Sequence, residues 1–323
     1  MGTFVFFGGK GGVGKTTISS AYALKSARAG QETLIVSTDP AHSTSDVFDQ
    51  DFDDEPQSVE DEPHLWAMEI DPEDEVEAHM MDVKRRMTDQ VSPAIVNEID
   101  RQIELAHQTP GAYEAALFDR FIEVMRTADD YDRVVFDTSP TGGTLRLLSL
   151  PEFLEEWLER LVDKRAESID LFEKAAIGKK EARRRAEDDP IIQHLRERKE
   201  KFEFAGETLR DDAAFYLVLN PDELSIRETD RAVDAMAEEG LHVDGLVINK
   251  VTPAPDDDEE GRGAAYLAER VATERERIDE VRNSFDQPVV AIIEARTREI
   301  KGDLLETVAD ELEIDVRPDA PEA

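Results

Sequence analysis

The chain has 323 residues, in which 76 Asp and Glu outnumber 38 Lys and Arg and give a formal net charge of −38. Cysteine is absent, which excludes disulfides, iron–sulfur ligation and thiolate metal sites. The acidic balance argues against nucleic acid or an anionic membrane as the main partner, because both attract basic surfaces. The sequence shows neither a run of 18 apolar residues nor a signal peptide, and we expect a cytoplasmic protein.

The acidic residues are spread along the whole chain and are not gathered into one tail. This dispersal, with Arg more frequent than Lys, is typical of adaptation to a salt-rich cytoplasm. At 1 M salt the Debye length is only ~3 Å, so repulsion between the carboxylates is screened. The composition therefore predicts a halophilic protein that loses structure at low ionic strength.

The first element is an apolar run at residues 3–7, typical of a buried strand, which precedes a glycine-rich segment and a helix pattern that ends before Gly30. The glycine-rich segment matches the phosphate-loop pattern G-x-x-x-x-G-K-[ST]. We predict that its backbone N–H groups bind ATP, that Lys15 reaches the β and γ phosphates, and that Thr16 binds Mg²⁺. The predicted nucleotide-binding residues here are Gly9, Lys10, Gly11, Gly12, Val13, Gly14, Lys15, Thr16 and Thr17.

Lys10 is unusual, because an ordinary phosphate loop does not require a lysine directly after its first glycine. With Lys10 the loop resembles the signature-lysine branch of phosphate-loop ATPases. In that branch two protomers face each other across two nucleotides, and the signature lysine reaches the partner's phosphates. The resemblance implies a nucleotide-linked homodimer in which Lys10 acts in trans as a catalytic residue, alongside Lys15.

Residues 33–37 predict a second strand, which is followed by Asp39 and Pro40. An acidic residue at the carboxyl end of a strand beside the phosphate loop can orient the water that attacks the γ phosphate. Asp39 is therefore a candidate catalytic residue. An N-cap or Asx turn before Pro40 explains the residue equally well, and the local sequence leaves both interpretations open.

Residues 133–136 predict a further strand, and Asp137 at its end suits a Walker-B-like role, in which we expect it to bind Mg²⁺ through water. The next residues, 138–144 (TSPTGGT), are small and rich in glycine. This segment can change its backbone path when the γ phosphate leaves, and we interpret it as switch II.

Three motifs make a family resemblance specific: STDPAHSTSDVF, LWAMEIDP and DTSPTGGTLRLL. They resemble the family of the arsenical-pump ATPase and of the ATPases that guide tail-anchored membrane proteins, and the similarity runs from residue 4 to about residue 312. The family more often has His where this chain has Gly143. Residues 253–263 are acidic where zinc-binding members carry C-x-x-C, so no zinc is expected, and dimerisation should depend on nucleotide and surface packing.

Residues 72–130 and 150–209 predict a helical insertion, and residues 1–71, 131–149 and 210–323 predict the ATPase core. The insertion contains several methionines, among them Met80 and Met87, which in most proteins fill a core. In the family the corresponding insertion carries a hydrophobic groove for a client, so both interpretations stay open. Residues 174–201 are highly charged and predict solvated helices or a mobile cover over the insertion.

Further strands are predicted at residues 65–70, 214–219, 246–248 and 289–293, with helices at 225–239 and 304–312. Asn249 follows one of these strands and aligns with the family's adenine-binding Asn, with a simple strand-end turn as the alternative. The family commonly has a proline beside the adenine, and Ile293 and Glu294 stand there in this chain.

Alternating strands and helices predict an α/β fold with a doubly wound, mostly parallel sheet, as in P-loop NTPases, and with a helical insertion. The resemblance implies a Mg²⁺-dependent cytosolic ATPase. Its homodimer would capture and release the hydrophobic transmembrane segments of tail-anchored proteins, with a membrane receptor as a further partner and no nucleic acid.

One alternative function is that of the catalytic subunit of an arsenite or anion efflux pump, and the lack of thiolates weakens this alternative. Another is a partitioning or division-site positioning ATPase, whose membrane-binding members end in a basic amphipathic helix, whereas this chain ends in an acidic segment.

Overall fold

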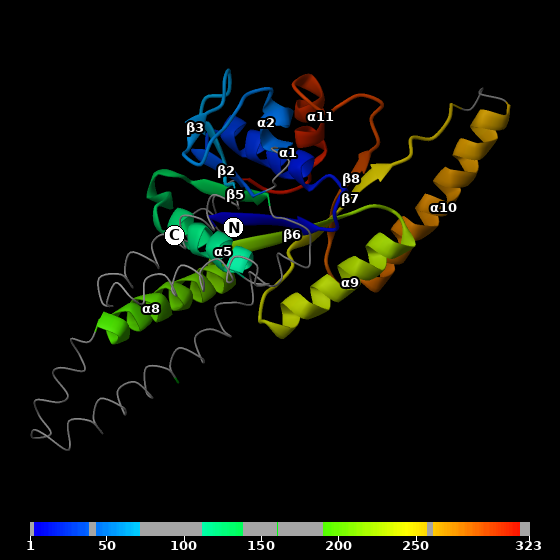
Figure 1. The fold of residues 1–323 in the computed structure, drawn as a ribbon. Helices are drawn as coiled ribbons and strands as arrows, with labels where there is room; N and C mark the ends of the chain where they lie inside the picture. The colour runs from blue at the N-terminus through cyan, green and yellow to red at the C-terminus, as the bar shows by residue number, and fades with distance from the viewer. Residues whose placement is uncertain are drawn as a thin grey trace, which may run out of the picture.

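The computed structural model describes residues 3–38, 43–71, 112–137, 160, 190–256 and 261–316. Its centre is an eight-stranded sheet in the order β3-β4-β2-β5-β1-β6-β7-β8 (Figure 1). The strands are β1 (Phe4–Gly9), β2 (Thr33–Ser37), β3 (Gln57–Ser58), β4 (Leu65–Glu69), β5 (Arg133–Asp137), β6 (Ala213–Leu219), β7 (Gly245–Val251) and β8 (Val289–Glu294). Only the pairing of β3 with β4 is antiparallel in the described sheet, so the carboxyl ends of the other strands lie at one edge.

Helices cover both faces of the sheet (Figure 1). On one face lie α1 (Lys15–Arg28) and α11 (Asp303–Glu311), and on the other lie α5 (Ala112–Arg126), α8 (Pro190–Asp211) and α9 (Glu223–Glu238). The described chain also contains α2 (Ser43–Phe48), the 3-10 helix η1 (Ala128–Asp130) and α10 (Arg262–Ser284). A mostly parallel sheet between two helical layers is the doubly wound α/β fold, and this prediction is confirmed.

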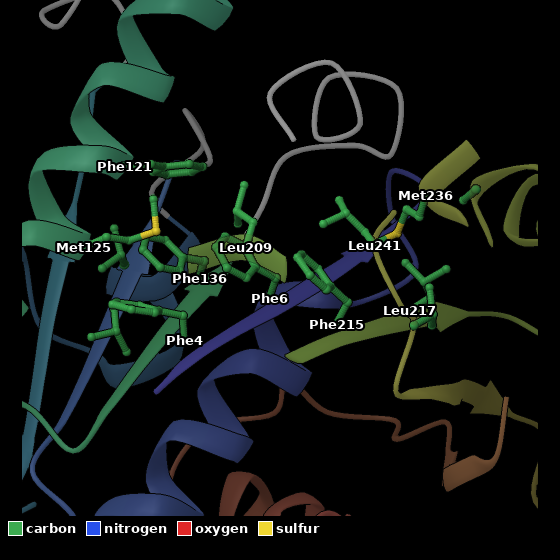
Figure 2. Packing of buried hydrophobic residues seen from close by; sticks show 14 of the residues in the cluster. Phe4, Phe6, Phe121, Met125, Phe136, Leu209, Phe215, Leu217, Met236 and Leu241 are labelled. Carbon is green, nitrogen blue, oxygen red and sulfur yellow. The ribbon is translucent and has the colours of Figure 1, made fainter. Parts of the chain in front are cut away.

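Strand β1 contributes side chains to the hydrophobic cores on both faces of the sheet, because successive side chains of a strand point to opposite faces. Phe6 belongs to the core with α5 and α8, whereas Phe7 belongs to the core with α1. Figure 2 shows Phe6 beside Phe136 of β5 and Phe215 of β6, with ring centroids 4.5 and 5.1 Å away. Phe121 of α5 packs against Phe136 at 4.9 Å. The strand that carries the glycine-rich segment is therefore held at the centre of the sheet.

The predicted strands are all present, and the structure extends several of them. Residues 246–248, for example, belong to the seven-residue strand β7. Elements that the sequence analysis leaves out include β3, α2 and α10. Strand β3 lies inside the acidic segment that follows α2, and α10 has few apolar positions, so neither shows a clear hydrophobic period.

Helix α5 and all but the last two residues of α8 fall within the residues predicted for the insertion, and both helices contribute to the core on the sheet. Phe118 of α5 stacks on Phe202 of α8 with ring centroids 5.8 Å apart, and Ala205 and Leu209 of α8 are buried. Residues 72–111, 138–159 and 161–189 lie outside the described residues. That part of the chain contains Met80, Met87, Gly143 and the predicted switch II, so the division into core and insertion stays a prediction.

Candidate functional site

The glycine-rich segment joins the central strand to a helix at the carboxyl edge of the sheet. Strand β1 lies between β5 and β6 and ends at Gly9, and α1 begins at Lys15. Gly9 has φ 145°, and a Cβ there would lie 2.3 Å from the carbonyl oxygen of Val218 on β6. Only glycine fits so close to a neighbouring strand, which explains the first glycine of the motif.

Gly14 forms the N-cap of α1 with φ 95°, and no side chain caps this helix start. Within the described part of the chain, no residue accepts a hydrogen bond from the backbone N–H of Gly12 or Gly14. A helix N-terminus with open N–H groups favours bound anions, because its N–H groups and its dipole both attract negative charge. The segment therefore fits the phosphates of ATP.

Lys15 and Thr16 stand at the first turn of α1. Lys15 is 9% exposed as a residue, and its Nζ donates a hydrogen bond to the carbonyl oxygen of Lys10 at 3.3 Å. The Lys15 ammonium thus lies over the loop that precedes its own helix. Thr16 is half-buried in the same turn. These positions suit a cation for the β and γ phosphates and a hydroxyl ligand for Mg²⁺.

The side chain of Lys10 has a different environment from that of Lys15. Its Nζ lies 3.7 Å from a carboxylate oxygen of Glu228 on α9, and the two side chains are 33% and 35% exposed. A half-exposed ion pair at this distance is weak. Lys10 is therefore free to exchange this contact for a stronger one with a phosphate.

Asp137 lies at the carboxyl end of β5, where three strands meet. It is in register with Phe7 of β1 and with Ser37 of β2, and it is only 1% exposed. A buried carboxylate beside the phosphate loop fits a site for Mg²⁺, which prefers oxygen ligands and retains water. Asp39 follows Ser37 by two residues and lies outside the described residues, so its role stays a prediction.

Asn249 is placed against the phosphate loop. Its Nδ2 donates a hydrogen bond to the carbonyl oxygen of Val13 at 2.8 Å, and its Oδ1 accepts one from the backbone N–H of Lys250 at 2.8 Å. The residue is 4% exposed. One amide hydrogen and one lone pair are left over from these two bonds, so adenine binding by Asn249 stays a prediction.

Glu69 is a buried residue near the site that the sequence analysis did not single out. One of its carboxylate oxygens accepts hydrogen bonds from the backbone N–H groups of Thr44 and Ser45 at 2.9 and 3.0 Å, and the other accepts one from Ser45 Oγ at 2.8 Å. These bonds hold the start of α2, directly after residues 39–42. The only signal for Glu69 in the sequence is its place in the motif LWAMEIDP.

Positive charge gathers at the loop of this strongly acidic chain. The side chains of Lys10 and Lys15 come from the loop and the helix start, and Lys250 Nζ donates a hydrogen bond to the carbonyl oxygen of Gly12 at 2.6 Å. Local cations attract phosphate even where the net charge is −38, because interactions beyond a Debye length are screened.

Two negative findings concern the described residues alone. They contain no group of three or more His, Cys, Asp or Glu side chains arranged to hold a metal ion. They also include no helix with the length and apolar character that crossing a bilayer requires. A Mg²⁺ site built from one hydroxyl, one carboxylate and phosphate oxygens needs no such group.

Comparison with known proteins gives a family match over nearly the whole chain. The family model described as "Anion-transporting ATPase" matches residues 2–313. A protein of Aquifex aeolicus (strain VF5), named as a candidate arsenical pump-driving ATPase, is 35% identical over 87% of this chain and 88% of its own length. The ATPase ASNA1 homolog 1 of Paramecium tetraurelia is 33% identical over 93% and 88%. The ATPase GET3A of Arabidopsis thaliana is 32% identical over 93% and 80%.

The match and the geometry agree, because the residues that form the strand, loop and helix start lie inside the matched range and fit a nucleotide triphosphate. The resemblance seen in the sequence is confirmed. The chain therefore belongs to the anion-transporting ATPase family, and it is an ATPase that hydrolyses ATP with Mg²⁺.

Proposed function

We propose that this ATPase closes as an ATP-bound homodimer around the hydrophobic transmembrane segment of a tail-anchored client and releases the segment after hydrolysis. The observation that carries the proposal is the placement of Lys10. Its side chain pairs with Glu228 on α9, whereas the side chain of Lys15 bonds within its own phosphate loop. The two lysines thus point to different partners, which supports a role for Lys10 on the nucleotide of a second copy.

In this mechanism catalysis is positional and electrostatic. Lys15 and the partner's Lys10 would stabilise the charge that develops on the transferring phosphoryl group. Thr16 and Asp137 would hold Mg²⁺, which when bound neutralises charge on the β and γ phosphates. Asp39 would orient the attacking water. Loss of the γ phosphate would then remove the contact that joins the two copies.

The length of a client segment supports two copies. A membrane-spanning helix has about 20 residues and is about 30 Å long. Helix α8 has 22 residues, but Phe202, Ala205 and Leu209 in its second half are buried. Its first half runs away from the sheet (Figure 1). The 12 residues before Phe202 span about 18 Å. One such segment is shorter than a client, whereas the insertions of two copies, placed next to each other along the client, could cover it.

The name of the Aquifex relative favours a second function, that of an ATPase that drives an arsenical pump. Soft metalloids bind thiolates, and this chain has no cysteine. It could still drive a membrane partner, but not through thiolate activation. Stimulation of its ATPase rate by arsenite would reverse this ranking.

The proposal is tested with the Asp39→Asn variant, which should bind Mg·ATP without hydrolysing it. The purified variant is mixed in molar KCl with a labelled C-terminal transmembrane segment, and the complexes are sized by light scattering. The expected product contains two ATPase chains and one segment, and it forms only with ATP.

Two controls separate the steps. A segment interrupted by charged residues should not be captured, because a charge in an apolar groove is costly. An Asp39→Asn, Lys10→Ala double variant should bind ATP and stay monomeric. A dimer that forms with ATP but does not bind the intact segment would contradict the client proposal without contradicting the ATPase activity.

A further inference from the structure

Two consecutive residues at the end of β7 hold the phosphate loop from outside. Asn249 Nδ2 donates to the carbonyl oxygen of Val13 at 2.8 Å, and Lys250 Nζ donates to that of Gly12 at 2.6 Å. The donors and acceptors are 236 and 238 residues apart in the chain. The end of strand β7 therefore contacts two successive peptide groups of the loop.

Lys250 reaches Gly12 from an unusual backbone conformation. Its φ is 58°, in the left-handed region that residues other than glycine rarely adopt. The conformation is supported by the hydrogen bond from the Lys250 N–H to Asn249 Oδ1. The pairing of β7 with β8 is also irregular between Ile248 and Val251, so the two residues between them leave the regular ladder. Such irregularities redirect a side chain, and here the side chain of Lys250 meets the loop.

The loop approaches these two residues as closely as it can. A Cβ on Gly14 would lie 2.4 Å from Asn249 Nδ2 and 3.8 Å from Lys250 Cε. No side chain fits at 2.4 Å, so Gly14 is needed for this contact as well as for its positive φ. The last glycine of the phosphate-loop motif and the end of β7 therefore depend on each other.

The two hydrogen bonds determine which way the loop's peptide groups face. In a trans peptide the C=O and the following N–H point in opposite directions. A Val13 carbonyl held by Asn249 turns the Gly14 N–H away from β7. The N–H of Val13, on the peptide group that Lys250 holds, donates to the carbonyl oxygen of Lys10 at 3.5 Å. The Lys10 carbonyl is likewise occupied by Lys15 Nζ. Carbonyl oxygens that would repel phosphate are thus bonded to amides and ammonium groups.

We propose that Asn249 and Lys250 form a clamp on the phosphate loop, and that Lys250 is a positioning residue for ATP. The clamp, defined by these two residues, keeps the carbonyl oxygens of Gly12 and Val13 turned toward β7, so that the N–H of Gly14 at the helix start faces the phosphates. The proposal concerns nucleotide binding by one chain and does not depend on a dimer or a client. It gives Asn249 a task besides any contact with adenine.

The test compares ATP with a ligand that has phosphates and no base. Affinities for Mg·ATP and for Mg·tripolyphosphate are measured in molar KCl by competition with a fluorescent ADP analogue. Lys250→Met removes the ammonium and keeps the aliphatic stem. We expect this substitution to lower the affinity for both ligands by the same factor, about tenfold, as for loss of a charge-assisted hydrogen bond. Lys250→Arg should restore both affinities to within about threefold of wild type.

Controls exclude a general effect of charge or stability. Lys301→Met removes the same charge at a partly exposed site before α11 and should leave both affinities unchanged. Without nucleotide, Lys250→Met should remain fully folded at the assay temperature, with only the small drop in unfolding midpoint that loss of one hydrogen bond causes. Weakening of ATP alone would mean that Lys250 contacts the base and would overturn the proposal, as would unchanged affinities for both ligands. Asn249→Ala should also weaken the binding of tripolyphosphate. If Asn249 only contacted adenine, this substitution would leave tripolyphosphate binding unchanged.

Discussion

Gly14 is the residue at which two constraints on the phosphate loop meet. Its φ is 95°, and a Cβ there would lie 2.4 Å from Asn249 Nδ2. We predict that Gly14→Ala weakens Mg·ATP binding by at least about tenfold, because the left-handed conformation alone costs an L residue about 1–2 kcal/mol. The added methyl group must also displace Asn249. Isothermal titration calorimetry measures the change.

Substitutions at two other glycines distinguish the cost of a left-handed backbone from the cost of a steric contact with Asn249. Gly12 in the loop has φ 80° and Gly30 after α1 has φ 88°, and at neither would a Cβ meet an atom within 4 Å. Gly30→Ala should therefore lower stability and leave ATP affinity unchanged. Gly12→Ala should weaken ATP less than Gly14→Ala does. Equal losses at residues 12 and 14 would show that the contact with Asn249 does not matter.

Lys10 carries the prediction about catalysis in trans. We expect Lys10→Ala to lower the ATPase rate by about 10³, the lower end of the range for loss of an arginine finger, because the partner's active site loses a cation that acts in the transition state. Binding of Mg·ATP to the single chain should change little. Single-turnover measurements with saturating ATP report the rate of the chemical step.

The matched control for Lys10 is Glu228, its ion-pair partner at 3.7 Å. Glu228→Gln breaks the pair and keeps the lysine, and an exposed pair contributes only about 0–1 kcal/mol. Its ATPase rate should stay within about twofold of wild type. Hydrolysis by Lys10→Ala at the wild-type rate would refute the trans mechanism, and an equal loss in both variants would assign the effect to the ion pair.

At the scale of helices and strands, the sequence predicts those elements whose signals lie within a short stretch of the chain. The strand, loop and helix from Phe4 to Arg28 could be predicted, because apolar period, glycine spacing and the Lys-Thr pair all lie within one short segment. The position of Asp137 beside the loop also follows, since it ends a buried strand. The bond from Asn249 to Val13 could not be predicted, because it depends on the strand order β1-β6-β7.

Helix α10 shows why other elements escape prediction. Its buried side chains are Val271, Glu274, Ile278 and Val281, a narrow stripe in which one of the four is a carboxylate. A helix is predicted from the spacing of its hydrophobic residues, and a buried carboxylate at one of these positions interrupts that pattern. Glu274 is buried because it accepts hydrogen bonds from the backbone N–H and hydroxyl of Thr252 at 2.6 and 2.8 Å and from Arg270 at 2.8 Å. These bonds attach α10 to the residue that follows β7.

The bonds of Glu274 predict a pH-dependent contribution to stability. Burial raises the pKa of Glu274, but the hydrogen bonds from Arg270 and Thr252 together outweigh burial and lower it below its ordinary value of 4.5. A lowered pKa stabilises the folded state above the unfolded pKa, and this stability is lost as the pH falls through the folded pKa. Glu274→Gln should therefore be less stable than wild type at pH 7, and the difference should disappear in acid below pH 4.5.

Denaturant unfolding in molar KCl at several pH values measures this difference. Glu276→Gln is the control, because Glu276 is exposed on the same helix and its loss should change stability by less than about 0.5 kcal/mol. A constant difference between wild type and Glu274→Gln at every pH would show that the carboxylate's charge does not stabilise the contact with Thr252.

At the scale of the whole molecule, the net charge of −38 opposes both folding and the approach of ATP. The lysines at the phosphate loop act over a few ångströms, whereas repulsion from the rest of the chain acts over a Debye length. That length falls from ~10 Å at 0.1 M salt to ~3 Å at 1 M. High salt therefore removes the long-range repulsion and leaves the short contacts at the loop largely intact.

The corresponding prediction is that the protein unfolds when salt is removed. Circular dichroism during stepwise dialysis from molar KCl into dilute buffer should show a cooperative loss of helix signal. Sucrose stabilises by exclusion from the protein surface without screening charge, so it should not replace the salt. Neutralising the exposed carboxylates Glu269, Glu276 and Asp279 of α10 should move the midpoint to lower salt, because fewer charges then need screening. An unchanged spectrum in dilute buffer would contradict the halophilic interpretation, and full protection by sucrose would attribute the effect to solvent exclusion and not to screening.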